Sequence, residues 1–262
     1  ILIFGCNLGI SGAALGTVIS QIVSFTILVI GTVKKSSVSI NVKNFKITVE
    51  KIEALLQGGV PSLARNILMC LTLIVLNRSA GVYGDTALAA MSIVQRFTFM
   101  MTAVLLGLGQ GFQPVCGFNY GAKLYGRVRS AFWFCVRTGT IFFSAVLVIG
   151  EIAAPQIIGA FCNGNPDVLH LGVLIMRTQW ISCPLFSFII ISSMMLENIN
   201  RYKAATFASM ARQGIFLIPL LLILPRFWGF TGIIICQPLS DFLCFAVTVC
   251  MVLPVLRELK TS

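Results

Sequence analysis

Residues 97–130 read FTFMMTAVLLGLGQGFQPVCGFNYGAKLYGRVRS. An apolar run leads into GLGQGFQPVCGFNYGAK at 107–123, which holds five glycines, a proline and several side-chain amides, and the arginines of LYGRVRS follow. Apolar segments of this length that end in basic residues are typical of membrane-spanning helices. The stretch therefore predicts a membrane protein in which the glycine-rich part is the end of a spanning helix.

The composition of the whole chain supports this class. The 262 residues are 57% hydrophobic and 10% charged, with a mean hydropathy of +0.95, whereas soluble domains carry about 25% charged residues. The nine cysteines are scattered through apolar runs without metal-ligand spacing, so they are interpreted as small hydrophobic residues, and no metal site is predicted. The lipid bilayer is the expected surrounding medium.

Seven apolar segments are long enough to cross a bilayer, because a spanning helix needs about 20 residues. The predicted fold class is therefore an all-α polytopic membrane protein. The predicted spans are 8–33, 53–78, 87–116, 130–161, 168–195, 204–224 and 230–256.

The charges of the connections alternate along the chain. The turns at 80–85, 162–167 and 225–229 are short, and the connections on that side carry two Lys/Arg, whereas those on the other side carry twelve. The positive-inside rule places the basic connections and the C-terminus in the cytoplasm of a multi-pass protein of the cell membrane. The net charge of +11 is thus interpreted as an orientation signal, and no nucleic-acid partner is predicted.

The longest break divides the chain. Residues 1–33 are predicted to be the last helix of a first lobe, 34–51 a basic cytoplasmic linker, 52–256 a six-helix lobe, and 257–262 a cytoplasmic tail. Because the chain starts at Ile1 and this division resembles a two-bundle transporter plan, we expect it to be the C-terminal part of a longer protein.

Two ionisable residues, Arg212 and Asp241, lie deep inside predicted spans, where charges are expensive and are candidates for function. Counted from the helix ends at 1.5 Å per residue, each lies roughly 14 Å from the cytoplasmic surface of a core about 30 Å thick. We expect them to meet, as a structural ion pair or as a carboxylate that exchanges a proton or sodium ion. An arginine partner favours the ionised carboxylate, which weighs against proton exchange unless the pair separates.

Other polar residues also lie within predicted spans. Arg96, Arg137 and Arg177 lie about ten residues into their helices and have no obvious acidic partner, so they are expected to face an interior cavity. Gln95, Gln110 and Gln113 add polar surface to the span that contains Arg96. Together with Arg212 and Asp241, Gln95, Arg96 and Gln113 are the predicted cavity or coupling network.

Several motifs resemble one transporter family. GQGFQPVCGFNYGAKLYGRVRSA closely resembles a glycine-proline-asparagine signature of multidrug and toxic compound extrusion (MATE) transporters, in the DinF-like and MepA-like branch. VQRF at 94–97, RQGIFLIPLLLILP at 212–225, GFTGIIICQPLSD at 229–241 and GISGAALGTVISQ near the N-terminus are similar to that branch as well. The resemblance spans essentially the whole chain.

The resemblance implies twelve helices in two lobes and cation-coupled export without an organic cofactor, the coupling ion being H⁺ or Na⁺. Acidic residues that the family places on its first helix fall outside this chain. The glycine-rich stretch is then interpreted as a cytoplasmic gate and helix-packing segment. Its predicted residues are Gly111, Pro114, Gly117, Asn119 and Gly121.

The leading functional hypothesis is a secondary antiporter that exports amphipathic, drug-like organic compounds, as a monomer when full length. The alternatives are a lipid-linked oligosaccharide flippase and an exporter of anionic metabolites, because the spans hold several cations and few acids. An enzyme is not predicted, since neither a nucleophile–base pair nor carboxylates at catalytic spacing occur in the spans.

Overall fold

The computed structural model describes residues 9–35, 48–162 and 164–261. The chain divides into two compact units, Ile1–Ile52 and Glu53–Ser262. In the first unit α1 (Gly9–Lys35) is a single helix that agrees with the predicted span 8–33. Most of the predicted linker, residues 36–47, lies outside the described residues.

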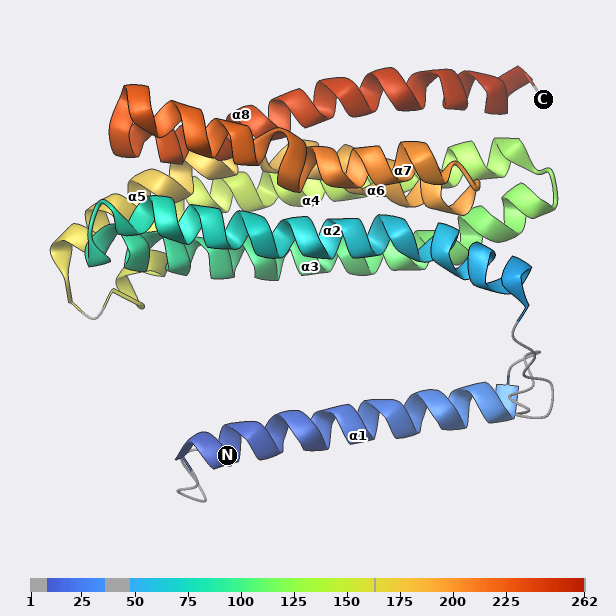
Figure 1. Ribbon diagram of the computed structural model, residues 1–262, viewed down its shortest axis with the longest axis horizontal. Coiled ribbons are helices and arrows are strands. Elements are labelled where there is room, and N and C mark those ends of the chain that lie inside the picture. The colour runs from blue at the N-terminus through green and yellow to red at the C-terminus, as the bar shows by residue number, and fades with distance from the viewer. Residues whose placement is uncertain (1–8, 36–47, 163, 262) are drawn as a thin grey trace. The chain divides into compact units, whose positions relative to one another are not determined.

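The second unit is a helical bundle, and the predicted all-α class is confirmed (Figure 1). Helices α3, α4 and α6 pack against one another, and α8 packs against α4, α5 and α6. The elements are α2 (Val49–Gly81), α3 (Asp85–Gly121), α4 (Tyr125–Gly159), α5 (Pro166–Trp180), α6 (Cys183–Asn198), α7 (Tyr202–Met210), the π-helical turn η2 (Ala211–Ile215) and α8 (Leu217–Thr261).

Among the described residues, four helices are long and apolar enough to cross a membrane, or five if α5 and α6 form one span. They are the Ser62–Gly81 part of α2, then α3, α4 and the Leu217–Leu259 part of α8. Seven spans were predicted. Part of the difference arises because the last two predicted spans meet within α8, and the first predicted span corresponds to α1, a helix of 27 residues.

The predicted span 168–195 is broken into α5 and α6, which meet at an angle of 51°. Pro184 lies in the first turn of α6 and has no N–H to donate to the carbonyl of Trp180, so the helical hydrogen-bond ladder is interrupted there. Gly150 of α4 permits this arrangement, because a Cβ at that position would lie 2.3 Å from Cε3 of Trp180. Such close approach through small residues is typical of membrane bundles.

Helix α8 contains the reversal that was predicted as a turn at 225–229. Gly229 has φ 56° and ψ −138°, values that non-glycine residues rarely adopt, and Figure 1 shows the chain turning back at this end of α8. Tyr83 supports the turn, since its ring packs 5.5 Å from that of Phe230. The two halves of α8 are therefore adjacent antiparallel helices.

The glycine-rich stretch is helical almost to its end, because α3 continues through Gly121 and ends five residues beyond the predicted boundary at 116. Lys123, at φ 59°, closes α3 with a Schellman motif, in which Leu124 N–H bonds to the carbonyl of Asn119 and Lys123 N–H to that of Tyr120. Asn200, at φ 62°, ends α6 in the same way. The predicted end of a spanning helix is thus found here, and membrane helices tolerate glycine and proline at such positions.

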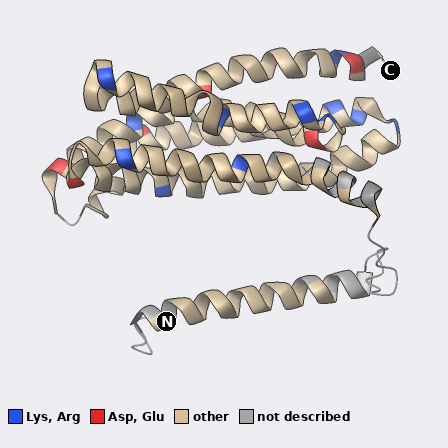
Figure 2. Cartoon of the chain, in the orientation of Figure 1, with Lys and Arg blue, Asp and Glu red and all other residues tan. Residues whose placement is uncertain are grey.

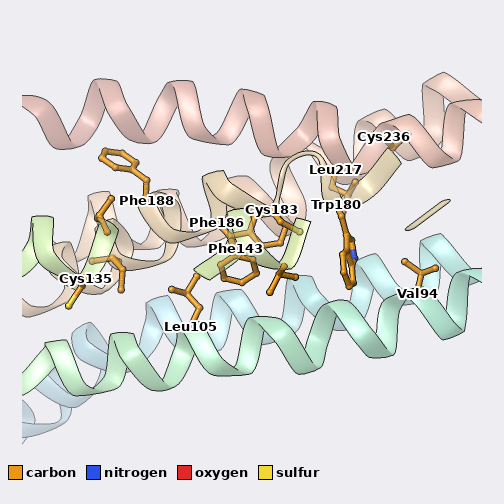
Figure 3. Close-up of a cluster of buried hydrophobic side chains, with 14 of the residues drawn as sticks. Val94, Leu105, Cys135, Phe143, Trp180, Cys183, Phe186, Phe188, Leu217 and Cys236 are labelled. Atoms are coloured by element: carbon orange, nitrogen blue, oxygen red, sulfur yellow. The ribbon is translucent and has the colours of Figure 1, made fainter. Parts of the chain in front are cut away.

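The bundle core is mainly aromatic and aliphatic (Figure 3). Phe143 of α4 and Phe186 of α6 are both about 1% exposed and pack edge to face, with ring centroids 5.7 Å apart. Phe188 joins Phe132 to Phe245 of α8 through two further ring contacts. These contacts fix α4, α6 and α8 relative to one another and so position the polar residues that lie among them.

Candidate functional site

A cavity of about 370 Å³ lies within the second unit, between helices α2, α3, α5, α6 and α7 and the start of α8. Its wall is partly apolar, but guanidinium, amide and hydroxyl groups converge on it. Polar members of the wall are Arg65, Asn66, Thr72, Gln95, Thr98, Thr102, Gln110, Gln179, Ser193, Ser209, Arg212 and Gln237. A mostly preformed cavity with convergent polar groups is the usual form of a small-molecule site.

A local break in helical hydrogen bonding, the π-helical turn η2, contains one of the charged residues of this region. Arg212 lies in η2, where Phe216 N–H bonds to the carbonyl of Ala211, five residues back, at 3.2 Å. Pro219, one turn later, has no N–H for the carbonyl of Ile215, so an ordinary α-helical ladder cannot run through this point. Such π-helical turns are frequent at functional sites.

Asp241 of α8 is fully buried and receives three side-chain donors. Arg212 Nε donates to Oδ1 at 3.1 Å, and Ser182 Oγ donates to Oδ2 at 2.7 Å. Gln237, one turn earlier on α8, donates through Nε2 to Oδ2 at 3.4 Å. A buried carboxylate is stable only when it is paired and hydrogen-bonded in this manner, so the cluster is a closed network of four side chains.

Arg212 connects this network to the cavity. Its Cζ lies 3.8 Å from the centroid of the Phe186 ring, in cation–π geometry. Its backbone carbonyl accepts a hydrogen bond from Ser240 Oγ at 3.2 Å. With Nε bound to Asp241 and the planar group held over Phe186, the guanidinium is fixed in the cavity wall.

Part of the remaining polar wall is also ordered by side-chain contacts. Trp180 Nε1 donates to Thr98 Oγ1 at 3.0 Å, which ties the end of α5 to α3. Ser209 Oγ, by contrast, is buried and has no hydrogen-bond partner in the described part of the chain. An unpartnered hydroxyl in a cavity wall is a group that a bound molecule or water could satisfy.

The structure brings together part of the predicted network. Gln95 and Arg212 line the cavity, and Asp241 lies directly behind Arg212. The predicted meeting of Arg212 with Asp241 is confirmed as an ion pair. Arg96 is exposed and Gln113 is half-buried, and neither lines the cavity.

Several wall residues were not predicted. Gln237 lies close to the predicted depth of Arg212 and Asp241 but was not placed in the predicted network, although it precedes Asp241 by four residues and so shares its helix face. Ser182 is 59 residues from Asp241 and meets it only through the bend between α5 and α6, so the sequence holds no signal for that contact. Arg65 lies on α2 among apolar residues and was not singled out.

Arg96, Arg137 and Arg177 do not line the cavity of this bundle, and the expectation that they face an interior cavity of the transporter stays a prediction. All three are exposed on the surface of the bundle. Arg177 also has an acidic partner, since its Nε lies 3.5 Å from Glu151 Oε2 and its Nη2 donates to the Glu151 carbonyl at 3.0 Å.

The predicted gate segment contains a different close contact from the one expected. A Cβ at Gly111 or Gly121 would meet nothing within 4 Å, and one at Gly117 only Asn198 Oδ1 at 3.5 Å. The tight approach is at Gly109, where a Cβ would lie 2.2 Å from Met194 Sδ. Helix packing within the described chain thus uses the face of Gly109.

Pro114 lies inside α3 and does not end it. Asn119 donates from Nδ2 to the carbonyl of Val115, at 2.8 Å, within the same helix. The motif that ends α3 uses the backbone carbonyl of Asn119 rather than its side chain. A role of the segment in gating is not addressed by these contacts and stays a prediction.

The family model described as MatE matches residues 61–223 of the chain, more than half of its length. The chain is 30% identical over 266 residues to the multidrug export protein MepA of Staphylococcus aureus. It is 27% identical over 262 residues to MepA of Staphylococcus saprophyticus. Each match covers 100% of this chain and 57% of the relative, so the chain spans little more than half the length of these proteins.

Solved structures share the fold. The outward-facing conformation of a multidrug resistance MATE family transporter of the MOP superfamily superposes with a TM-score of 0.88 at 20% identity, over 100% of this chain and 59% of that one. A Vibrio cholerae MATE transporter superposes with a TM-score of 0.86 at 20% identity, over 98% and 58% respectively. The arrangement of the helices described above is thus the arrangement found in these transporters.

Proposed function

The chain belongs to the MATE family, and from this premise we propose that it works in a secondary antiporter that exports organic, drug-like compounds in exchange for H⁺ or Na⁺. The observation that carries the proposal is the family match over residues 61–223. That range contains every residue of the cavity wall except Gln237. Curated relatives over the same range are named as multidrug export proteins.

We propose that transport proceeds by rocking of this bundle against a partner lobe around the cavity, as in transporters built from two related bundles. Three features support such motion. The bend between α5 and α6, the π-helical turn η2 and the reversal at Gly229 are points where regular helical bonding is already interrupted. Helices bend most readily at such points.

Within this mechanism Gln95, Arg212 and Asp241 act as the cavity and coupling network. Arg96 and Gln113 remain proposed members that act outside the cavity wall. Asp241→Asn keeps the shape of the side chain but removes its charge, so export should lose its dependence on the coupling ion while the protein still folds. Export by Asp241→Asn that responds to both gradients as the wild type does would exclude Asp241 from coupling.

The segment with Gly111, Pro114, Gly117, Asn119 and Gly121 is proposed to close the cavity at the basic end of the bundle. The open space at Gly111 and Gly121 supports a surface that another part of the protein approaches. Replacing both glycines by leucine should abolish export without reducing the amount of protein in the membrane. Unchanged export would remove this segment from the gate.

The basic end of the bundle is proposed to face the cytoplasm. Lys and Arg gather where α3 meets α4, where α6 meets α7, and at the C-terminus, which lie at the same end of the bundle (Figure 2). A cysteine at Arg127, in an otherwise cysteine-free protein, should resist membrane-impermeant maleimide in intact cells. A cysteine at Val82 should react. The opposite pattern would invert the topology.

The function itself is tested by ethidium efflux from cells that produce the full-length protein. Efflux should stop when the coupling gradient is collapsed, and collapsing the proton and sodium gradients separately identifies the ion. If no organic dye, cationic or anionic, leaves the cells in a gradient-dependent manner, the antiporter proposal is wrong. The protein is expected to run as a monomer in mild detergent.

A second candidate is a lipid-linked oligosaccharide flippase or an exporter of anionic metabolites with the same bundle plan. One observation favours it, namely that the charged residues of the cavity wall are Arg65 and Arg212. Flippase activity would appear as translocation of a pyrophosphate-linked lipid across proteoliposomes without an imposed ion gradient. An antiporter would not move that lipid.

A further inference from the structure

The charges of the cavity wall have one sign. Of the described residues that line the cavity, the charged ones are Arg65 of α2 and Arg212 of η2, and none is Asp or Glu. A ligand in this cavity would therefore meet guanidinium groups from two different helices. Guanidinium groups bind carboxylate, sulfonate and phosphate oxygens with well-aligned, charge-assisted hydrogen bonds.

The nearby carboxylates do not line the cavity. Asp241 is fully buried and its oxygens are occupied by Arg212, Ser182 and Gln237. Glu197 interacts electrostatically with Arg65, yet it does not line the cavity, and the pair is farther apart than 4 Å. Asp241 pairs directly with Arg212 and Glu197 interacts with Arg65 from farther away. Glu197 Oε1 is buried without a hydrogen-bond partner among the described residues, but neither carboxylate lines the cavity.

The Arg212 guanidinium retains donors for a ligand. Its Nε is used by Asp241 and its plane rests on Phe186, while its two terminal nitrogens make no hydrogen bond to any described residue. Because Asp241 and Phe186 already fix the group, an anion would bind it with little loss of side-chain entropy. Arg65 likewise makes no hydrogen bond or close ion pair within the described part of the chain.

The rest of the wall fits an amphipathic ligand. Met69, Phe99, Leu106, Ile189 and Met194 supply apolar surface in the same cavity. The hydroxyl of Ser209, which lacks a partner, and the amides of the wall supply further donors. An apolar body with an acidic head would satisfy both parts of this wall.

We propose that the cavity binds the anionic group of an amphipathic organic acid, whose carboxylate, sulfonate or phosphate oxygens accept hydrogen bonds from Arg65 and Arg212. The inference rests on the proposed export function and names the substrate class of that cavity. A cationic ligand would instead lie against two guanidinium groups, because neither nearby carboxylate is part of the cavity wall. Because the two nearby carboxylates balance the charge of the two arginines, the hydrogen bonds available inside the cavity decide whether an anionic or a cationic ligand binds.

The test is a binding measurement on the full-length protein in nanodiscs of neutral lipid, with two probes that share one apolar body. Pyrenebutyrate carries a carboxylate, and its counterpart carries a trimethylammonium group in the same place. We expect pyrenebutyrate to bind at least about tenfold more tightly, which is the effect of one charge-assisted hydrogen bond. Equal or tighter binding of the ammonium probe would overturn the proposal.

Variants locate the effect. Arg65→Gln should weaken pyrenebutyrate about tenfold and leave the ammonium probe unchanged, and Arg65→Lys should restore part of the loss. The control is Arg137→Gln, which makes the same change of net charge on an exposed residue outside the cavity wall. A loss shared by Arg137→Gln, or a loss of both probes in Arg65→Gln, would count against the site.

Export of the same two probes from cells separates this inference from the proposed function. Gradient-dependent export of the ammonium probe alone would keep the antiporter and overturn the anion site. Binding of pyrenebutyrate that depends on Arg65, without gradient-dependent export of either probe, would keep the site and overturn the antiporter.

Discussion

Two ion pairs in this bundle use the same chemical groups in very different surroundings. Arg212 and Asp241 are 3.1 Å apart, and their side chains are 12% and 0% exposed. Arg177 and Glu151 are 3.5 Å apart, and their side chains are 47% and 41% exposed. Both arginines lie well inside helical segments, so the position of a charge along a helix does not reveal which face it occupies.

The difference shows what a buried pair requires. Asp241 has a serine and an amide in addition to its arginine, whereas the Glu151 carboxylate has Arg177 as its ion-pair partner. A buried charge without a full set of partners costs several kcal/mol, while an exposed pair contributes about 0–1 kcal/mol. The four-residue network is therefore where single changes should have their largest effects.

The largest effect is expected for Asp241→Ala. Removal of the carboxylate leaves Arg212 largely buried without its counter-ion, and this should lower the free energy of unfolding by about 3–5 kcal/mol. The measurement is thermal or denaturant unfolding of the purified protein in one detergent. A loss below about 1 kcal/mol would mean that the buried pair contributes no more to stability than an exposed one, which would contradict the difference between the two pairs.

The matched control replaces both partners. Arg212→Met combined with Asp241→Leu removes the two charges together and should recover most of the stability lost in Asp241→Ala, because apolar replacement of a buried pair is often neutral. A double variant as unstable as the single one would show that packing at position 241, rather than charge, holds α8 against η2.

The next effect concerns Ser182→Ala. Its Oγ donates to the Asp241 carboxylate at 2.7 Å, and a hydrogen bond to a charged group contributes about 1.5–3 kcal/mol. We expect a loss of about 2 kcal/mol in the same unfolding assay. Ser130→Ala, at an exposed position on α4, is the control and should change stability by less than about 0.5 kcal/mol. Equal effects of the two variants would remove Ser182 from the network.

This cluster also shows which contacts of the site can be predicted from the sequence and which cannot. The Arg212–Asp241 contact follows from helix length and one short turn, because two antiparallel neighbours bring residues of equal depth together. Ser182 joins the cluster only because Pro184 breaks the helix and redirects its end. The bend depends on packing against Gly150 of α4, which no local pattern encodes.

In the glycine-rich stretch, too, the helix could be predicted from the sequence but its packing face could not. The apolar residues that precede it predicted a membrane-spanning helix, and α3 is long and apolar enough to be one. Gly111, Gly117 and Gly121 were predicted to be packing residues, yet Gly109 makes the tight contact with Met194. Which face of α3 meets α6 is decided by rotation about the helix axis, and that rotation is set by side chains far away in sequence.

A smaller effect is expected for Glu151→Gln. The variant loses the ion pair to Arg177 but keeps the backbone carbonyl of residue 151, which accepts from Arg177 Nη2 at 3.0 Å. We expect the free energy of unfolding to fall by about 0.5–1 kcal/mol, since the pair is exposed. A loss as large as that of Asp241→Ala would show that this surface becomes buried in the full-length protein.

The smallest effect is expected for Glu258→Gln, which removes the ion pair between Glu258 near the end of α8 and Arg201 between α6 and α7. These side chains are 59% and 48% exposed, so the free energy of unfolding should fall by less than about 0.5 kcal/mol at low salt.

Salt distinguishes this exposed pair from the buried one, because screening shortens the reach of exposed charges to about 3 Å at 1 M salt. The difference between Glu258→Gln and wild type should therefore vanish there, whereas the Asp241→Ala difference should persist, because buried charges are screened much less. A Glu258→Gln effect that salt leaves unchanged would place this pair with the buried one.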